Sequence, residues 1–430
     1  MKEISNQRKN SLRQMGVDRW FNIVAAMLLC VVATCSFSAC EKDKEAPDVP
    51  SDPSYAPSRT VLVYMVAENS LNGQVSSDIS EMLNGMRDST FYPNDRLVIY
   101  LDDIGLPRIY VVERYTKART LSDLTPSKTW SEDVNSSSPQ QLAEVLEYTK
   151  SMCGASSYGL VMWSHASGWI PSSYGEDRLA PRRTFGLDNG RNSSSSSLDG
   201  NQMAIEDLAR VVEDFGGVDF IFFDACFMQS VEVAYTLRNA AKYIIASPAE
   251  IPGPGANYQT MVKAMMKMDD YADKILTAYY DQYGSEGDNY GIVISSVKTT
   301  ALSHFAAYMK TVVANHREDL LNANYENVQD YFRYDVWASV YPDFYDMKGV
   351  MKQVLSDEEM VQWEEEAAKV VNLKTSYTWY SAFNRLLNGI DKEQCCGVSM
   401  FVPLDKYAGS SNRFDEEYLD TEWAQDVWVE

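Results

Sequence analysis

VDFIFFDACFMQS, residues 218–230, contains the features from which the architecture of this chain follows. The apolar run Phe220–Phe223 has the composition of a strand that is buried on both faces of a parallel sheet. Asp224, Ala225 and Cys226 follow this run, and residues 228–239 have the spacing of an amphipathic helix. Cys226 is therefore predicted to lie at a strand-to-helix junction, on the edge where open α/β sheets bind ligands.

A second predicted strand ends in a similar way earlier in the chain. Residues 158–163 (YGLVMW) read as a buried strand, and His165 lies in the loop that follows it. If the two strands are parallel neighbours, His165 and Cys226 emerge side by side. A free thiol has a pKa of about 8.5, so only about a few per cent of it is thiolate at neutral pH, and an adjacent imidazole raises that fraction.

A structural role for these two residues has to be weighed against a reactive one. A single cysteine after a strand is more often a small buried apolar side chain than a nucleophile. The chain has three histidines, however, and the other two, His304 and His316, lie in polar, helix-like surroundings. His165 and Cys226 are thus each predicted at the end of a strand. A reactive pair and a purely structural role therefore both remain possible at this point.

Five segments of the chain resemble, in order, the clostripain-like cysteine peptidases, whose fold is that of caspases and gingipains. They are RTVLVYMVAENSLNG from Arg59, LVMWSHASGW from Leu160, TFGLDNG from Thr184, VDFIFFDACFMQ from Val218 and ASPAEIPGPGANY from Ala246. The resemblance implies a cysteine endopeptidase that hydrolyses peptide bonds. In it, Cys226 is the nucleophile and His165 the general acid and base.

The resemblance also implies the remaining parts of the site. The oxyanion would be held by backbone N–H groups at Cys226 and at Ala166, where the family usually has glycine; alanine keeps the donor but resists positive φ. Asp224 matches a family position whose carboxylate contacts a basic P1 side chain, which predicts cleavage after Arg or Lys. The alternative is that Asp224 caps the following helix. Glu250, in a loop rich in proline and glycine, is a second candidate for substrate binding.

A long connection, residues 170–199, joins the two predicted strands. Loops of this length are usually functional or disordered, and in the relatives a basic site in this region is cut autocatalytically. Arg178, Arg182 and Arg183 are the candidate cleavage positions, and the two later arginines are preferred because a cut after them leaves TFGLDNG attached to the Cys226 fragment. An uncut connection is expected to occupy the site and keep the enzyme inactive.

The sequence requires no cofactor and assigns no metal ligands. Asp188, Asn189 and Asp199 offer oxygen atoms of the kind found in calcium loops, but Ser193 stands where an EF-hand needs glycine, so a calcium loop is left without support. The formal net charge of −23 argues against nucleic acid and anionic membrane surfaces as partners. Peptide or protein substrates with basic residues are the favoured partners.

The first 58 residues resemble a bacterial lipoprotein leader and tether. Basic residues precede an apolar stretch from Trp20 to Ala39, and the sequence FSAC at residues 37–40 resembles a lipobox in which Cys40 is lipidated. The stretch is also long enough to remain as an uncleaved membrane helix. Acidic residues and prolines follow as far as residue 58. These features predict an outer-membrane lipoprotein, anchored at the cell surface.

The predicted fold class is α/β, with a caspase-like, mostly parallel sheet covered by helices on both faces and a largely helical C-terminal extension. The predicted domains are the signal peptide (1–39), an acidic, proline-rich tether (40–58), a peptidase core (59–258) and a helical region (259–430) whose strands complete the sheet. The expected helices include 70–87, 139–152, 228–239, 260–283, 298–313, 356–373 and 377–387, with a hairpin at 109–119 and late strands at 290–295 and 397–402.

Two other functions remain open at this stage. A surface lipoprotein could keep the caspase-like fold and bind peptides or glycans without cutting them, and Ala166 is the main support for this alternative. A transpeptidase or processing enzyme could use the same pair of residues on a specific partner.

Overall fold

A ten-stranded sheet forms the centre of the part of the chain that the structure describes. The structure, a computed structural model, describes residues 59–170, 185–191, 200–284, 290–332, 343–381, 386–407 and 414–429. The strand order is β13-β12-β10-β9-β8-β5-β1-β2-β3-β4. The five strands from β9 to β2 are parallel, and antiparallel strands extend the sheet on both sides. The predicted α/β sheet is therefore confirmed.

The main sheet is built from segments of two to eleven residues. Its strands are β1 (Thr60–Val66), β2 (Arg96–Asp102), β3 (Arg108–Glu113), β4 (Lys128–Thr129), β5 (Tyr158–Trp163), β8 (Val218–Asp224), β9 (Ala241–Ala246), β10 (Gly291–Lys298), β12 (Val371–Ser381) and β13 (Leu386–Gly389). Two small antiparallel pairs lie outside it, β6 (Phe185–Asp188) with β7 (Asn201–Met203) and β11 (Tyr345–Asp346) with β14 (Ser399–Met400).

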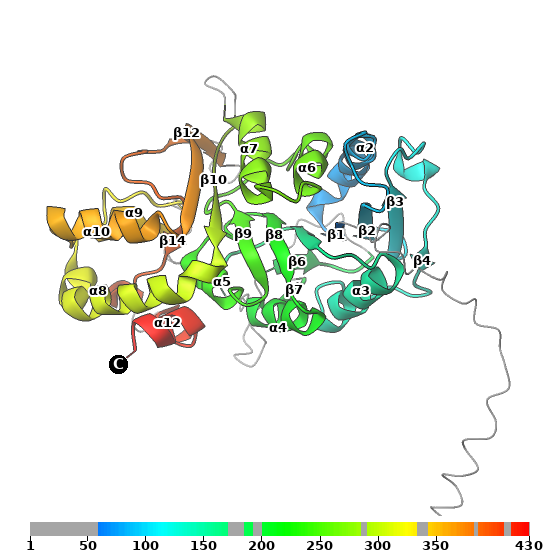
Figure 1. The fold of residues 1–430 in the computed structure, drawn as a ribbon. Coiled ribbons are helices and arrows are strands. Elements are labelled where there is room, and N and C mark those ends of the chain that lie inside the picture. The colour runs from blue at the N-terminus through cyan, green and yellow to red at the C-terminus, as the bar shows by residue number, and fades with distance from the viewer. Residues whose placement is uncertain are drawn as a thin grey trace, which may run out of the picture. The chain divides into compact units, whose positions relative to one another are not determined.

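Helices cover both faces of the sheet (Figure 1). One face carries α2 (Val75–Gly85), α6 (Tyr258–Met265) and α7 (Tyr271–Tyr283), and the other carries α3 (Pro139–Met152), α4 (Ile205–Phe215) and α5 (Val231–Thr236). Side chains of β1 alternate between the two cores, with Val63 in one and Tyr64 in the other. Every residue of β1 is buried, as expected for a central strand of a covered parallel sheet.

The C-terminal part adds five further helices. They are α8 (Leu302–Asn322), α9 (Met347–Met351), α10 (Asp357–Ala367), α11 (Phe414–Leu419) and α12 (Glu422–Val427). Their buried side chains belong to the same core as those of α3 and α4. Within the described ranges, no helix combines the length and the apolar character needed to cross a membrane.

Several predicted elements differ from the structure. The predicted helix 377–387 is wrong, because residues 377–381 lie in β12 and residues 386–387 in β13; the Tyr, Trp and Thr side chains of β12 favour a strand, and β12 pairs with β10. The predicted hairpin 109–119 is also wrong, because β3 pairs with β2 and β4 instead. Of the two late strands, β10 joins the main sheet, whereas β14 pairs with β11.

The helix predictions fail mainly at interruptions. The predicted helix 260–283 is divided into α6 and α7, and Asp270, at the start of α7, has a φ of +49°. The predicted helix 228–239 begins only at Val231, because Ser230 accepts a hydrogen bond from the Val233 N–H and caps the helix. The first turn of the predicted helix 70–87 is a 3₁₀ turn, Ser70–Gln74.

Candidate active site

The ends of strands β5 and β8 form the centre of the candidate site. The two strands are parallel neighbours, and Trp163 is paired with Asp224 at the last position of the ladder. His165 and Cys226 each follow two residues after these partners. The predicted pair of neighbouring parallel strands is therefore present, and both residues leave the sheet at its carboxyl edge.

Three loops pack together beyond this edge. A Cβ atom added at Gly168, which has a φ of +69°, would lie 2.7 Å from the carbonyl oxygen of Phe227. Phe227 itself has a φ of +63°, and its N–H donates to the Ala249 carbonyl at 3.1 Å. The loops that carry His165, Cys226 and Glu250 are therefore in direct contact, and a non-glycine residue holds the strained backbone directly after Cys226.

The imidazole of His165 is bonded to a serine from the loop after β1. Its Nε2 lies 2.8 Å from the Ser70 hydroxyl oxygen. The adjacent Asn69 donates to the carbonyl oxygens of Val66 and Leu187, which fixes this loop against β1 and β6. Burial lowers the pKa of His165 from 6.5 to about 4, so the ring is uncharged at neutral pH.

The thiol of Cys226 is held in its protonated form. Its pKa is raised from 9.0 to about 12, mainly by burial and also by the nearby carboxylates of Glu250 and Asp224, whereas the Ile251 N–H, which donates to Sγ at 3.4 Å, acts to lower it. No hydrogen bond joins Sγ to the imidazole within the described part of the chain. Burial and two carboxylates therefore favour the neutral thiol over the thiolate here.

Ala166 and Cys226 present backbone donors at this edge. Ala166 forms an antiparallel bridge with Phe185, in which the Gly186 N–H donates to the His165 carbonyl at 3.0 Å. In this type of bridge the flanking residues make the hydrogen bonds, so the Ala166 N–H is not used. No acceptor among the described residues takes up the N–H of Ala166 or of Cys226. Ala166 is not among the described residues with positive φ, so alanine is unstrained here.

Asp224 lies buried beside the cysteine, with an exposed fraction of 3%. Its Oδ2 accepts hydrogen bonds from the Tyr258 hydroxyl at 2.8 Å and from the Ala256 N–H at 3.1 Å. Its Oδ1 has no donor among the described residues. The alternative role as a helix cap is wrong, because Ser230 caps α5.

Further acids and a tyrosine surround Asp224. Burial raises the pKa of Asp224 to about 6, and the charge of Glu81 adds to this effect. Asp78 accepts a hydrogen bond from the Trp163 indole at 2.9 Å, and burial raises its pKa to about 8. The hydroxyl of Tyr279 is buried, has no partner among the described residues, and interacts electrostatically with both Asp224 and Cys226.

Some parts of the site were missed by the sequence analysis, and others lie outside the described residues. The missed residues are Asn69, Ser70, Ile251, Tyr258 and Tyr279. All except Tyr279 had a signal, because they lie in the RTVLVYMVAENSLNG or ASPAEIPGPGANY segment. The residues outside the described ranges are Cys40, Arg178, Arg182, Arg183, Ser193 and Asp199. His304 and His316 lie on α8 and contact glutamates, so they take no part in this site.

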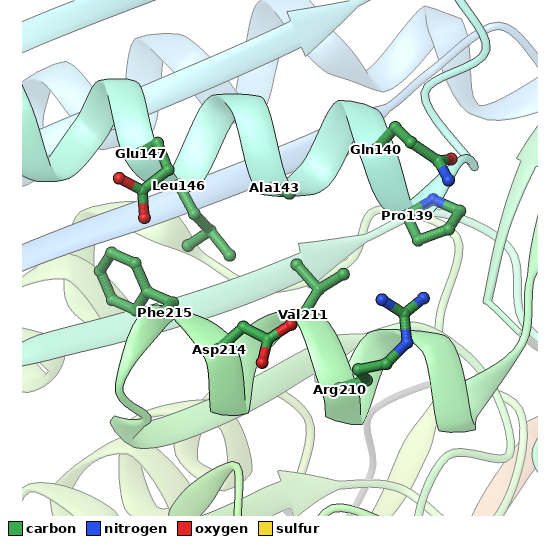
Figure 2. Close-up of a pocket in the computed structure, with 9 residues that line it drawn as sticks. All are labelled: Pro139, Gln140, Ala143, Leu146, Glu147, Arg210, Val211, Asp214 and Phe215. Carbon is green, nitrogen blue, oxygen red and sulfur yellow. The ribbon is translucent and has the colours of Figure 1, made fainter. Parts of the chain in front are cut away.

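A groove elsewhere on the molecule contains none of the predicted site residues. It has a volume of about 290 Å³ and lies between α3 and α4, where Glu147, Arg210, Asp214 and Phe215 contribute to its lining. Figure 2 shows these side chains on the two facing helices. The groove is therefore separate from the strand ends that carry His165 and Cys226.

Comparisons with known proteins agree with this arrangement. The model of the Clostripain family matches residues 63–429. Clostripain from Hathewaya histolytica is 29% identical over 226 residues, which are 46% of this chain and 40% of that protein, so the match spans less than half of this relative. Two solved structures match more fully, an inactive zymogen of a C11 protease from Parabacteroides distasonis and a secreted C11 cysteine protease from Bacteroides thetaiotaomicron in complex with an irreversible peptide inhibitor. Both are 29% identical and cover 86% of this chain and 98% of their own, with TM-scores of 0.70 and 0.69.

The neutral His165 predicts a specific loss of stability in acid. Because its pKa is lowered from 6.5 to about 4 on folding, the unfolded chain binds more protons between these two values, and stability falls as the pH falls through this range. The lowered pKa corresponds to at most about 3 kcal/mol of unfolding free energy. Between pH 7 and pH 4, the free energy of unfolding of the wild type is expected to fall by up to about 3 kcal/mol more than that of His165→Gln. Urea denaturation at the two pH values measures this difference.

The matched control is His304→Gln, whose parent side chain is 75% exposed. The buried carboxylates titrate in all three proteins, so their effect cancels in the comparison. Equal losses in the wild type and in His165→Gln would contradict the prediction.

Proposed function

The chain belongs to the clostripain family, and we propose that it is a cysteine endopeptidase in which Cys226 is the nucleophile and His165 the general acid and base. The observation that carries the proposal is the register of β5 and β8, with the two residues at equivalent positions beyond paired strand ends. The inhibitor complex of the Bacteroides thetaiotaomicron relative supports it, because that relative is described as a cysteine protease that takes a peptide inhibitor.

The proposed reaction begins with proton transfer from the Cys226 thiol to His165. Nε2 is bonded to the Ser70 hydroxyl, so Nδ1 is the ring nitrogen that remains to take this proton. Sγ then forms a bond to the scissile carbonyl carbon, the C–N bond breaks, and His165 gives its proton to the leaving amine. Water, deprotonated by His165, then attacks the acyl carbon, the C–Sγ bond breaks to release the acid, and His165 returns the proton to Sγ.

The backbone donors of Ala166 and Cys226 are proposed to bind the oxyanion. Both N–H groups lie at the strand ends and have no acceptor among the described residues, so they would not have to leave another partner. The negative φ of Ala166 supports this role, because the alanine does not have to adopt a strained backbone.

Asp224 is proposed to bind the P1 side chain and so to give a preference for Arg or Lys there. Glu250 is proposed as a second acidic residue for this contact. Asp224 is buried close to Cys226 and keeps one carboxylate oxygen without a donor among the described residues. Its other oxygen is held by Tyr258 and Ala256, which fixes the carboxylate. A guanidinium that reached the free oxygen would form a charge-assisted hydrogen bond in a largely desolvated place.

Activation by cleavage of the connection between His165 and Cys226 is also proposed. The neutral thiol and imidazole are the state expected of an inactive precursor, and the Parabacteroides distasonis relative is described as an inactive zymogen. Arg182 and Arg183 remain the preferred cleavage positions, with Arg178 as the third candidate. The lipid anchor at Cys40, the outer-membrane location and the basic peptide partners likewise remain proposals from the sequence.

The first test is hydrolysis of amide substrates with Arg or Lys at P1 by the purified chain. Cys226→Ala and His165→Ala are each expected to abolish turnover, because one removes the nucleophile and the other the proton acceptor. Cys153→Ala is the matched control, since Cys153 is a free, buried cysteine at the C-terminal end of α3. Full activity of Cys226→Ala would contradict the proposal, and peptide binding without turnover in the wild type would favour the non-catalytic alternative.

The second test concerns Asp224 and uses paired substrates with arginine or its neutral analogue citrulline at P1. Asp224→Asn is expected to weaken transition-state binding of the arginine substrate by roughly 2 to 4 kcal/mol, which is measured as a lower kcat/KM. The kcat/KM for the citrulline substrate should stay nearly unchanged. The wild-type preference for arginine should weaken as the pH falls through the Asp224 pKa of about 6, because the carboxyl group becomes neutral. Glu250→Gln, measured in parallel, separates the two acids. An unchanged preference in Asp224→Asn would assign the P1 contact elsewhere.

The third test is intact-mass analysis of the purified chain under native and denaturing conditions. A cut after Arg182 or Arg183 is expected in the wild type, with two fragments that remain associated because both contribute strands to one sheet. The cut should be absent in Cys226→Ala and displaced or lost when both arginines are changed to alanine. A single uncut chain with full activity would refute activation by cleavage and leave the peptidase assignment standing.

A further inference from the structure

A second pocket lies at one end of the main sheet, between the β12–β13 pair and the loop that follows α8. It has a volume of about 500 Å³, which is within the range of roughly 300 to 1,000 Å³ that is usual for small-molecule sites. β9 and β10 separate β12 from β8, and no described lining residue has a role in the proposed catalysis or P1 binding. The lining includes Asn327, Gln329, Tyr377, Trp379, Asn388 and Gln394.

Strand pairing brings an aromatic and an amide side chain together in this pocket. Trp379 is paired directly with Asn388 across the β12–β13 ladder, so the two side chains lie on the same face of the sheet. Tyr377, two positions earlier in β12, lines the same pocket. Trp379 is buried, with an exposed fraction of 2%, whereas Tyr377 is 59% exposed. The pocket thus combines a buried indole, an amide and an exposed phenol ring.

The polar part of the lining consists mainly of amides. Each of the four asparagine and glutamine side chains offers a carbonyl acceptor and N–H donors, so the set can bond hydroxyl groups in either direction. Among the described lining residues, only Asp391 carries a charge at neutral pH. Its two oxygens already accept from the Glu393 N–H at 3.0 Å and from Gln394 Nε2 at 2.7 Å. The lining therefore favours a neutral polar ligand over an ion.

Part of this hydrogen-bonding capacity is unused in the described chain. Gln394 donates to Asp391, and Gln329 donates to the Asp330 carbonyl at 3.3 Å, but neither side-chain oxygen accepts a bond from a described residue. The Trp379 indole N–H is buried and has no acceptor among the described residues. A buried donor without an acceptor is unfavourable, so a ligand hydroxyl that accepts from it would be stabilised. The N–H is covered, and a ligand would reach it after a small movement of the lining side chains.

Tyr377 supplies an aromatic surface at the exposed side of the pocket. The Lys392 ammonium lies 3.7 Å from the centroid of its ring, which is a cation–π contact with one face. With 59% of the side chain exposed, the ring keeps accessible surface beside this contact. The face of an aromatic ring is electron-rich and attracts the slightly positive hydrogens of C–H groups. Tyr377 is therefore suited to stack against an apolar C–H face of a ligand.

We propose that this pocket binds a neutral carbohydrate. A sugar ring carries hydroxyl groups around its rim, which match the amides, and C–H groups on its faces, which match the Tyr377 ring. A metal ion would require more charged oxygen ligands, and a phosphate would require cationic donors, which the described lining does not provide. A peptide has amide groups that such a lining could also bond, but it lacks the flat C–H face, so peptide binding is an alternative outcome of the test.

Carbohydrate binding does not rest on the proposed peptidase function. The pocket and the ends of β5 and β8 have no residue in common among those described, and β9 and β10 lie between them. A sugar in the pocket and a peptide beside Cys226 are therefore expected to bind without competition.

The test is binding of the wild-type chain to an array of neutral oligosaccharides built from glucose, galactose, mannose and N-acetylglucosamine. A retained oligosaccharide is then titrated in solution by calorimetry. Tyr377→Ala is expected to weaken its binding by roughly tenfold, the effect of about one lost stacking contact. Asn388→Asp keeps the shape of the side chain, removes its N–H donors and adds a charge, so a loss of similar size is expected.

Tyr92→Ala is the matched control, because Tyr92 is 60% exposed and lies outside the pocket. It should bind the oligosaccharide as the wild type does. Tyr377→Ala removes an exposed side chain and is expected to keep the wild-type Tm, so it decides the question even if Asn388→Asp fails to fold.

The proposal is overturned if no oligosaccharide of the array binds the wild type, or if Tyr377→Ala binds it with unchanged affinity. Displacement of the bound sugar by an arginine-containing peptide would place it at the Cys226 edge and would also overturn the proposal. Binding of neutral peptides in the pocket without any sugar would contradict the carbohydrate assignment. Sugar binding in a chain without turnover would support this proposal and remove the peptidase function alone.

Discussion

The parallel register between β5 and β8 is the constraint on which the rest of the site depends. No hydrogen bond joins His165 to Cys226 among the described residues, so their relative position depends first on the backbone ladder that ends at Trp163 and Asp224 and then on the packing of their loops. At the opposite edge, the buried Arg59 donates to Ser157 at 2.8 Å and to Asp219 at 2.8 Å, which ties the beginnings of β1, β5 and β8 together. The removal of one partner from a buried ion pair costs about 3 to 5 kcal/mol. Arg59 thus helps to fix the register from which both reactive residues emerge.

The electrostatics of the site explain why its geometry alone does not make it reactive. A thiol with a pKa of about 12 and an imidazole with a pKa of about 4 form a thiolate–imidazolium pair only at a cost on the order of 10 kcal/mol, before their mutual attraction is counted. Burial is the largest cause for both residues, and Glu250 adds to it for the thiol. The proposed activation would therefore have to change the solvation around the pair. The proposed basic P1 side chain near Asp224 and Glu250 would act in this direction, because it would bring positive charge to the thiol.

Sequence reasoning located the parts of the site that follow from strand composition. Buried apolar runs have few alternatives to a central strand, so β5 was predicted at its observed bounds, and His165 and Cys226 followed as residues at strand ends. The partners of these residues could not be found in this way. Ser70 lies at the start of a 3₁₀ turn, and the buried acids Glu68, Asp102 and Asp188 meet only through the arrangement of their strands. The helix predicted at 377–387 failed for a related reason, because pairing with β10 decided its structure.

Acidic residues gather in two places along the carboxyl edge of the sheet, and in both places burial makes their negative charge unfavourable. Asp224 and Glu250 lie near Cys226, while Glu68, Asp102 and Asp188 lie behind His165. Two backbone or hydroxyl donors hold Asp224 and leave one oxygen free, an arrangement suited to a transient cation on a substrate. Glu68 is buried among acids, and burial together with the charges of Asp102 and Asp188 raises its pKa to about 9, so a proton neutralises it at neutral pH. The chain with a net charge of −23 thus places carboxylates at this edge that are neutralised by a proton in one place and, as proposed, by the basic side chain of a substrate in the other.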